Sequence, residues 1–300
     1  MSNLARSTSH GEGRVLRTPS QHGLLDALRS ARSGAAALPA LAPESYARDH
    51  AAFEARSDQR ALIAAHLAAR LALRGDGPLA VLSVGCGDGS LDVRLAGPLT
   101  DVRPVRPVRY VGVDPYVGST TAFTAAMAGL GRESLSTEVH VATFDDAPVT
   151  GLFDVVTFVH SMYYVPDVAA TLRAAHNLLR PGGELIVLNA PRGALNLLVD
   201  VLAPPIQGHR QWFSDDIAAG LVEAGLQPEA TTTLDARVDL DGASEEVLDF
   251  AVQARLTPEL RPLVRAYLAA VSVPGLLSDD LRVPHPVDVY RVGRAVAGVS

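Results

Sequence analysis

The sequence has 300 residues, 48% of them hydrophobic, and a formal net charge of −7 at pH 7. This composition supplies a sizeable core and excludes a wholly disordered chain, and the acidic balance argues against nucleic acid as a partner. The single cysteine, Cys86, excludes a disulfide framework, and no histidine or carboxylate spacing predicts a metal site. No apolar run has the length of a signal peptide or a membrane span. We therefore expect a cytoplasmic protein without a membrane partner.

The chain begins with a segment rich in Ser, Arg, Gly and Pro, residues 1–40, which we expect to be loosely ordered. Residues 41–300 are predicted to form one domain. Within it, the spacing of Ala, Leu and Ile predicts a helical cap over residues 41–75. A second helical stretch, residues 244–281, is expected to be an insertion over the substrate site.

Between these stretches strand and helix signals alternate, which indicates βαβ units and a doubly wound, mostly parallel sheet. The clearest helix signal covers Val168–Leu179. The expected strands are Leu79–Val84, Val108–Val113, Glu138–Thr143, Asp154–His160, Glu184–Asn189, Thr231–Val238 and Pro286–Arg294.

A glycine-rich turn, Gly85-Cys86-Gly87-Asp88-Gly89, directly follows the first of these strands. Glycines permit positive φ and let the backbone approach a ligand closely, and this end of a first parallel strand is where doubly wound sheets bind nucleotides. Because position 90 is Ser, the dinucleotide pattern Gly-x-Gly-x-x-Gly is not met, which disfavours an NAD-dependent reductase.

Acidic residues follow the next two strands. Asp114, before Pro115, ends the second strand, where a carboxylate accepts hydrogen bonds from both hydroxyls of a ribose. A helix N-cap is the competing role. After the third strand come Thr143, Phe144 and Asp145, in a stretch suited to an adenine contact, although Asp145 and the adjacent Asp146 suit a helix cap equally well.

Together with Phe153–His160 and Leu178–Val187, these elements resemble class I S-adenosylmethionine (SAM)-dependent methyltransferases over residues 79–190. The resemblance implies a Rossmann-like fold of seven strands with an antiparallel last strand, and SAM as the methyl donor. The implied cofactor contacts are Gly85, Cys86, Gly87, Asp114, Pro115, Ser119, Thr143, Phe144, Asp145 and Val159.

The stretch His160-Ser161-Met162-Tyr163-Tyr164 resembles histamine N-methyltransferase and its bacterial relatives, and weaker likeness extends to Tyr46…Phe53…Ser57-Asp58-Gln59 and Ser214-Asp215-Asp216. That family's amine-binding glutamate falls on Gln59 or Asp58. Its other polar contacts fall on His160, His209 and His285. The implied substrate contacts are Tyr46, Phe53, Gln59, His160, Tyr163, Tyr164, His209, Trp212, Phe213 and His285.

Loss of the glutamate removes the anion that pairs with a cationic amine. We therefore expect methyl transfer to carbon or nitrogen of a small heteroaromatic molecule, indole- or imidazole-like, in bacterial specialised metabolism. Amine N-methylation and a non-catalytic SAM-binding module are the alternatives, in a monomer or a homodimer. Tyr164, Tyr163 or His160 is the candidate general base. The pKa of histidine is closer to neutral pH than that of tyrosine, whereas the position in the motif favours the tyrosines. Any of these side chains could instead be structural.

Overall fold

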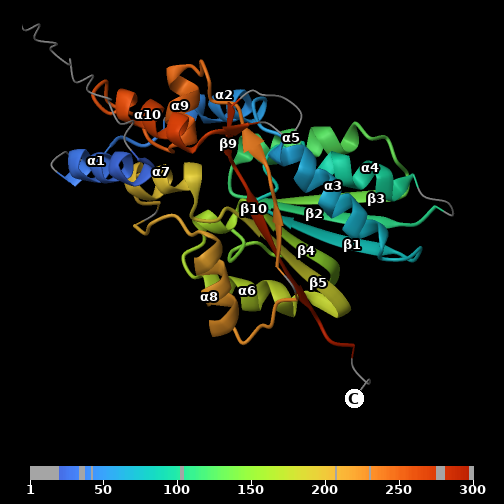
Figure 1. Cartoon of the computed structure of the whole chain (residues 1–300). Coiled ribbons are helices and arrows are strands. Elements are labelled where there is room, and N and C mark those ends of the chain that lie inside the picture. Colours follow the sequence, from blue (N-terminus) through green and yellow to red (C-terminus); the bar gives the residue numbers. More distant parts are fainter. Residues whose placement is uncertain are drawn as a thin grey trace, which may run out of the picture.

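A computed structural model describes residues 20–33, 38–41, 43–101, 105–206, 208–229, 231–274 and 281–296. Within these residues seven strands form one sheet in the order β3-β2-β1-β4-β5-β10-β6 (Figure 1). The strands are β1 (Leu79–Val84), β2 (Val108–Asp114), β3 (Leu135–Val141), β4 (Phe153–Val159), β5 (Leu179–Asn189), β6 (Thr232–Leu234) and β10 (Val287–Gly293). Strand β10 is antiparallel to β5 and β6, and the pairs from β3 to β5 are parallel. The expected doubly wound sheet with an antiparallel last strand is confirmed.

Helices cover both faces of this sheet (Figure 1). One apolar core joins it to α3 (Gln59–Ala72), α4 (Asp92–Thr100) and α5 (Val117–Ala128), and a second core joins the other face to α6 (Val168–Asn177) and α8 (Ser214–Glu223). Every residue of β1 is buried, because a central parallel strand faces helices on both sides. The carboxyl ends of β1, β2 and β4 therefore meet at one edge of a rigid platform.

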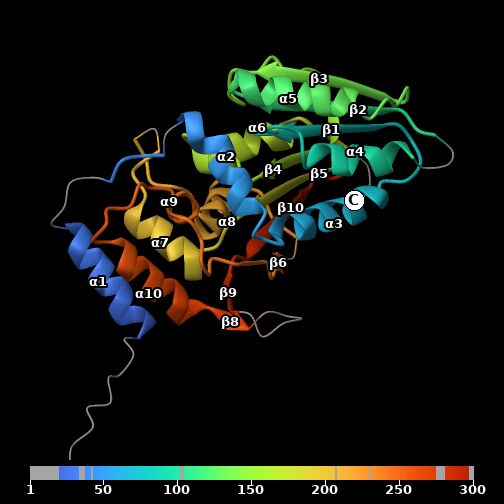
Figure 2. The same cartoon turned by 90° about the horizontal axis from the view of Figure 1, so that it is seen from above.

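A separate apolar core forms a cap at one end of the sheet (Figure 2). Its helices are α1 (Gln21–Ser33), α2 (Pro43–Glu54), α7 (Ala194–Leu202), α9 (Glu245–Ala251) and α10 (Arg261–Val271). A small sheet in the order β7-β9-β8 joins the cap and contains β7 (Arg237–Val238), β8 (Val273–Pro274) and β9 (Leu281–Pro284). The cap is thus assembled from segments at the start, middle and end of the chain.

The expected loose order of residues 1–40 is wrong for α1. This helix buries Leu24, Leu25 and Leu28 against the cap, and these leucines lie on one helical face. The Ser- and Gly-rich surroundings obscured this short amphipathic pattern. Residues 1–19 and 34–37 lie outside the described residues.

Three further expectations differ in detail. The helical stretch 41–75 is divided, because the chain turns between Glu54 and Gln59 to begin a second helix. The strand expected at Thr231–Val238 is two strands, β6 and β7, which belong to different sheets. The insertion 244–281 contains α9, α10 and the short strand β8; its residues 275–280 lie outside the described residues, and Leu281 begins β9. No helix in the described ranges is long and apolar enough to cross a membrane.

Candidate active site

The glycine-rich turn leaves β1 with positive φ at Gly85, Gly87 and Gly89, a conformation that favours glycine. A Cβ at Gly85 would lie 2.3 Å from the Cβ of Ser161, so the turn packs directly against the residue that follows His160. The space beside Gly87 is open. Gly85 therefore permits close packing against Ser161, whereas Gly87 borders open space at the sheet edge.

Asp114 at the end of β2 ties the glycine turn to the next strand. Its Oδ2 accepts a hydrogen bond from Gly87 N at 3.1 Å, and its Oδ1 accepts one from Tyr116 N at 2.9 Å. Burial raises the pKa of this carboxyl, while the two backbone donors oppose that shift. Each oxygen keeps a lone pair, so the turn-stabilising role and ribose binding are compatible.

Beneath the turn lies a buried polar group that sequence reasoning missed. Asp92, in the first turn of α4, accepts a hydrogen bond from the Tyr110 hydroxyl at 2.8 Å and bonds Ser83. Burial raises the pKa of Asp92 to about 6. The Cys86 thiol also points inward, against Gly112, and burial raises its pKa. The Cys86 side chain is therefore packing, and only its backbone faces the turn's outer surface.

The residues after β3 form a tight turn. The Thr143 hydroxyl donates to Asp146 at 2.7 Å, and the Phe144 ring meets Phe158 edge to face. Asp145 is exposed, and its carboxylate makes no hydrogen bond or ion pair within the part of the chain that the structure describes. Of the two acids, Asp146 therefore takes the structural role, and Asp145 keeps its oxygens available for a ligand.

Exposed apolar side chains gather at the same edge. Tyr116 and Val117 follow β2, Val141 ends β3 and Tyr164 follows β4, with exposed fractions of 70%, 65%, 52% and 43%. Large apolar side chains exposed together mark a binding surface more often than isolated ones do. Pro115, Ser119 and Val159 lie beside these residues in the sequence, with Ser119 and Val159 half-buried.

Arg60 on α3 is a further residue that sequence reasoning missed. Its guanidinium donates to Ser90 Oγ at 3.0 Å, just beyond the glycine turn, and pairs with Glu54 on α2. A fixed cation thus lies next to the turn. An arginine just inside a cap helix carries no sequence signal of its own, because arginines occur throughout this chain.

Beside the turn, a hydrogen-bonded cluster joins β4 to the cap. His160 Nδ1 lies 2.7 Å from the Tyr163 hydroxyl, and His160 Nε2 lies 2.8 Å from Gln59 Oε1. Gln59 Nε2 donates to the backbone carbonyl of His285 at 2.7 Å. The His285 ring in turn lies 3.3 Å from the Ser57 hydroxyl. Five residues from three separate segments of the chain are therefore joined in one network.

Asp58 is excluded from this cluster. Its carboxylate accepts a hydrogen bond from Arg237 N at 2.7 Å and so fixes α3 to β7. Asp58 and Gln59 were the two candidates for the position of the family's amine-binding glutamate. The buried Gln59 is the one that contacts His160. The side chain that meets His160 is neutral.

Aromatic side chains of α2 and α9 line the cap side. The Tyr46 and Tyr164 hydroxyls lie 3.3 Å apart, and Phe250 contacts the rings of Tyr46, His50 and Phe53 at about 5 Å between centroids. Phe53 meets His285 edge to face. His50 and Phe250 were missed as site residues, although His50 follows Tyr46 by one helical turn and so shares its face.

Burial moves the pKa values of this cluster away from neutrality. It lowers the pKa of His160 to about 3 and that of His285 to about 4. It raises the pKa values of Tyr163, Tyr164 and Tyr46. All five side chains are therefore uncharged near pH 7, which runs against His160 as a strong general base.

His209, Trp212 and Phe213 form a different group beside α8. The His209 and Trp212 rings stack at 4.9 Å, and Trp212 Nε1 donates to Val165 O at 2.9 Å. The Phe213 ring is fully buried beneath the Arg192 guanidinium. Among the described contacts none links this group to Gln59 or His160, so the ten expected substrate residues fall into two places.

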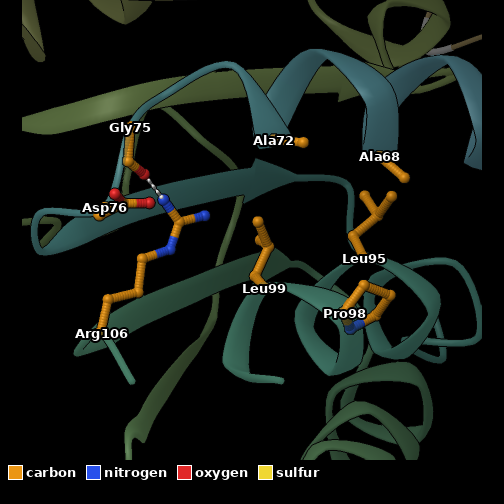
Figure 3. A pocket seen from close by; sticks show the side chains of 8 residues that line it. All are labelled: Ala68, Ala72, Gly75, Asp76, Leu95, Pro98, Leu99 and Arg106. Atoms are coloured by element: carbon orange, nitrogen blue, oxygen red, sulfur yellow. Dashed lines mark hydrogen bonds between the residues drawn. The ribbon is translucent and has the colours of Figure 1, made fainter. Parts of the chain in front are cut away.

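A cavity of about 90 Å³ lies at the opposite, amino edge of the sheet, between α3 and α4 (Figure 3). Ala68, Ala72, Leu95 and Leu99 form its apolar wall, and Arg106 donates a hydrogen bond to the Gly75 carbonyl. None of the expected site residues lines it. The candidate site therefore remains the edge with the glycine turn and the polar cluster, and this cavity is separate from it.

A family model for the methyltransferase domain matches residues 55–231. The chain belongs to this methyltransferase family. The match covers the glycine turn, Asp114 and the His160 cluster except His285, and it includes most of the sheet. Membership of this family implies SAM as the methyl donor and a small-molecule methyl acceptor.

Named relatives are ubiquinone biosynthesis O-methyltransferases. The enzyme from Xanthomonas oryzae pv. oryzae is 34% identical over 176 residues, which cover 55% of this chain and 68% of the relative. The enzyme from Marinobacter nauticus is 28% identical over 125 residues, or 40% of this chain and 48% of the relative. The expected class is confirmed, and these named relatives are O-methyltransferases instead of histamine N-methyltransferases.

Solved structures show the same fold. A Bacillus halodurans protein solved as a candidate methyltransferase has a TM-score of 0.54 and 16% identity, and covers 77% of this chain and 98% of its own. The YcgJ protein from Bacillus has a TM-score of 0.52 and 14% identity, and covers 77% of this chain and 99% of its own. At this identity the likeness extends to the fold alone.

Proposed function

We propose that this methyltransferase transfers the methyl group of SAM to a carbon or nitrogen of a small, neutral heteroaromatic molecule with an indole- or imidazole-like ring. The observation that carries the proposal is the uncharged, aromatic cluster around His160, which lies beside the glycine turn. Ser161 packs against Gly85, so the two halves of the site are in direct contact. The substrate identity and the roles below are parts of this proposal.

On the cofactor side, the proposed contacts are with residues at the sheet edge whose polar groups can still accept or donate hydrogen bonds to a ligand. Asp114 has one lone pair left on each oxygen for the two ribose hydroxyls. Asp145 has a free carboxylate for the adenine amino group, and Arg60 provides a cation near the turn for the carboxylate of SAM. Bound SAM supplies an electrophilic methyl group on a sulfonium. The protein's task is to hold the acceptor in line with it.

On the acceptor side, the side chains are aromatic or neutral and polar. A flat neutral ring stacks favourably against Tyr46, Phe250 and the tyrosine pair. The lowered pKa of His160 and the raised pKa values of the tyrosines favour orientation by hydrogen bonds over proton abstraction at rest. An imidazole nitrogen or an activated ring carbon suits such a site because neither requires a strong base.

Two other acceptor classes have different support. O-methylation is favoured by the ubiquinone biosynthesis relatives, whose names state that activity, and a phenol is the aromatic acceptor that would test it. Histamine-like N-methylation requires an anion for the amine. Asp58 is committed to the backbone of β7, and Glu54 is paired with Arg60 and His50, so the structure offers little support for that substrate.

The test is incubation of the protein with SAM and a panel of indoles, imidazoles, phenols and aliphatic amines, followed by mass spectrometry and NMR to locate the added methyl group. We expect ring methylation of an indole or imidazole, with Asp114→Ala as the matched control that loses it. Methylation confined to phenols would establish the O-methyl alternative. Methylation confined to aliphatic amines would contradict the proposal, and tight SAH binding without turnover would indicate a non-catalytic module.

A further inference from the structure

The polar cluster contains a continuous chain of four hydrogen bonds that begins and ends on backbone groups. The His285 carbonyl accepts from Gln59 Nε2 at 2.7 Å, and Gln59 Oε1 lies 2.8 Å from His160 Nε2. His160 Nδ1 lies 2.7 Å from the Tyr163 hydroxyl, which accepts from Ala190 N at 3.3 Å. Because a backbone carbonyl only accepts and a backbone N–H only donates, both ends of the chain have fixed polarity.

That polarity determines the position of each proton. The His285 carbonyl requires the amide nitrogen of Gln59, so the amide oxygen must face His160. This oxygen cannot donate, and His160 Nε2 must therefore carry a proton. A flipped amide would set two oxygens 2.7 Å apart, and the opposite histidine tautomer would set two lone pairs 2.8 Å apart. With His160 neutral, as its lowered pKa requires, one arrangement satisfies every partner.

The consequence reaches Tyr163. With Nε2 protonated, neutral His160 presents a lone pair at Nδ1, and the Tyr163 hydroxyl must donate its only proton there. Ala190 N–H occupies one lone pair of the same oxygen. Tyr163 is left with a single lone pair and no proton to offer. Tyr164 differs, because its hydroxyl faces Tyr46 and either oxygen of that pair can donate.

Two features indicate that the cluster is held rigidly. His160 has φ of 53°, an uncommon and strained conformation for a residue other than glycine. It persists where the surroundings fix the residue. Here two ring hydrogen bonds and the bond from His160 N to Leu188 O do so. Gln59 is also buried, so its amide has few alternative partners.

We propose that Gln59 is a positioning residue that fixes the tautomer of His160 and thereby makes Tyr163 a pure hydrogen-bond acceptor, which selects substrates that carry an N–H or O–H group. The selectivity rests on the proposed function, whereas the tautomer does not. A substrate proton pointed at Tyr163 would orient the ring, and a ring already methylated at that atom would be rejected.

The first test is the tautomer of His160, read from ¹⁵N chemical shifts of histidine-labelled protein. We expect a single neutral form with the proton on Nε2 from pH 5 to 9. In Gln59→Leu, and in the milder Gln59→Met, this preference is expected to be lost. Ser57→Ala is the control, since it removes the contact with the His285 ring and the bond from Gln59 N but keeps both partners of the Gln59 side chain. A proton on Nδ1, an imidazolium at pH 7, or an unchanged tautomer without Gln59 would overturn the proposal.

The second test compares two fragment pairs, indole with 1-methylindole and phenol with anisole, by titration into the SAH-bound protein while the His160 signals are followed. We expect the N–H or O–H member of at least one pair to bind at least tenfold more tightly and to shift these signals, and this difference to vanish in Tyr163→Phe. Equal binding within both pairs would overturn the selectivity. The proposed function fails separately, if the turnover panel gives only aliphatic amine products.

Discussion

The two halves of the site differ in the part of the molecule that builds them. The proposed cofactor side is formed by consecutive turns at the ends of β1, β2 and β3, and most of its hydrogen bonds involve the backbone. The proposed acceptor side is formed by side chains from α2, the start of α3, the end of β4 and the segment before β10. A backbone site is robust to side-chain changes, whereas a site made of side chains from distant segments is where specificity changes during evolution.

Gly85→Ala should have the largest effect. The new Cβ would lie 2.3 Å from Ser161 Cβ at a positive φ, so both halves of the site would be displaced. We expect SAM affinity, measured by isothermal titration, to fall more than about 100-fold, equivalent to about 2.7 kcal/mol. Gly87→Ala is the control, since it has the same strain with open space around it, and we expect a smaller loss. Equal affinities for the two variants would show that the contact with Ser161 is unimportant.

Asp114→Ala removes the carboxylate that joins the glycine turn to β2. Hydrogen bonds to a charged group contribute about 1.5–3 kcal/mol, so we expect SAM affinity to fall by about 10- to 100-fold. Asp145→Ala tests the adenine contact in the same titration and should have a smaller effect, because this carboxylate is exposed. If Asp114→Ala binds SAM normally, its carboxylate only holds the turn.

Tyr164→Phe examines the acceptor side alone. The hydroxyl lies 3.3 Å from that of Tyr46 and outside the backbone network of the glycine turn. We expect turnover to fall by about tenfold, the cost of one lost hydrogen bond of about 1.4 kcal/mol, with SAM affinity unchanged. Tyr46→Phe removes the partner hydroxyl and should show a smaller loss in the same assay. A parallel fall in SAM affinity would mean that the two halves are not separable.

The pH dependence of stability should have opposite signs in the two halves. Burial raises the pKa of Asp92 from 3.8 to about 6, so the folded protein binds the Asp92 proton more tightly than the unfolded chain does. The stability that this bound proton contributes is lost as the pH rises from 3.8 through about 6. Burial lowers the pKa of His160 from 6.5 to about 3, so stability from this residue is lost as pH falls below 6.5.

Thermal or urea unfolding between pH 4 and 8 measures this difference. Asp92→Asn should raise the free energy of unfolding above pH 6 by on the order of 1–2 kcal/mol, because a neutral amide is less costly to bury. His160→Gln should reduce the loss of stability below pH 6. The same pH profile in both variants as in the wild type would contradict the assigned shifts.

Local patterns predicted much of the fold. The alternation of apolar strands with helices identified the central strands, because each buried parallel strand is a continuous apolar run. The same patterns failed for α1, whose three buried leucines lie in a polar segment, and for Thr231–Val238, where the chain leaves one sheet for another. An alternating or apolar pattern predicts a strand, but it does not predict which strand will be its partner.

The acceptor site was predicted less completely. His160, Tyr163 and Gln59 were named and are hydrogen-bonded together, while His209 and Phe213 lie elsewhere. His50, Phe250 and Arg60 were missed, because each shows its position only when α2, α3 and α9 pack against one another. The choice between Gln59 and Asp58 likewise depended on which side chain β7 engages.

By itself the sequence determined the methyltransferase class and the glycine turn that Asp114 holds, since backbone geometry of this kind is encoded within a few residues. The tertiary structure decided the polarity and charge of the acceptor site. Burial made the histidines neutral, and the backbone carbonyl of His285 set the tautomer of His160 through Gln59. Protonation and hydrogen-bond direction depend on neighbours in space, and those neighbours come from segments that only the folded cap brings together.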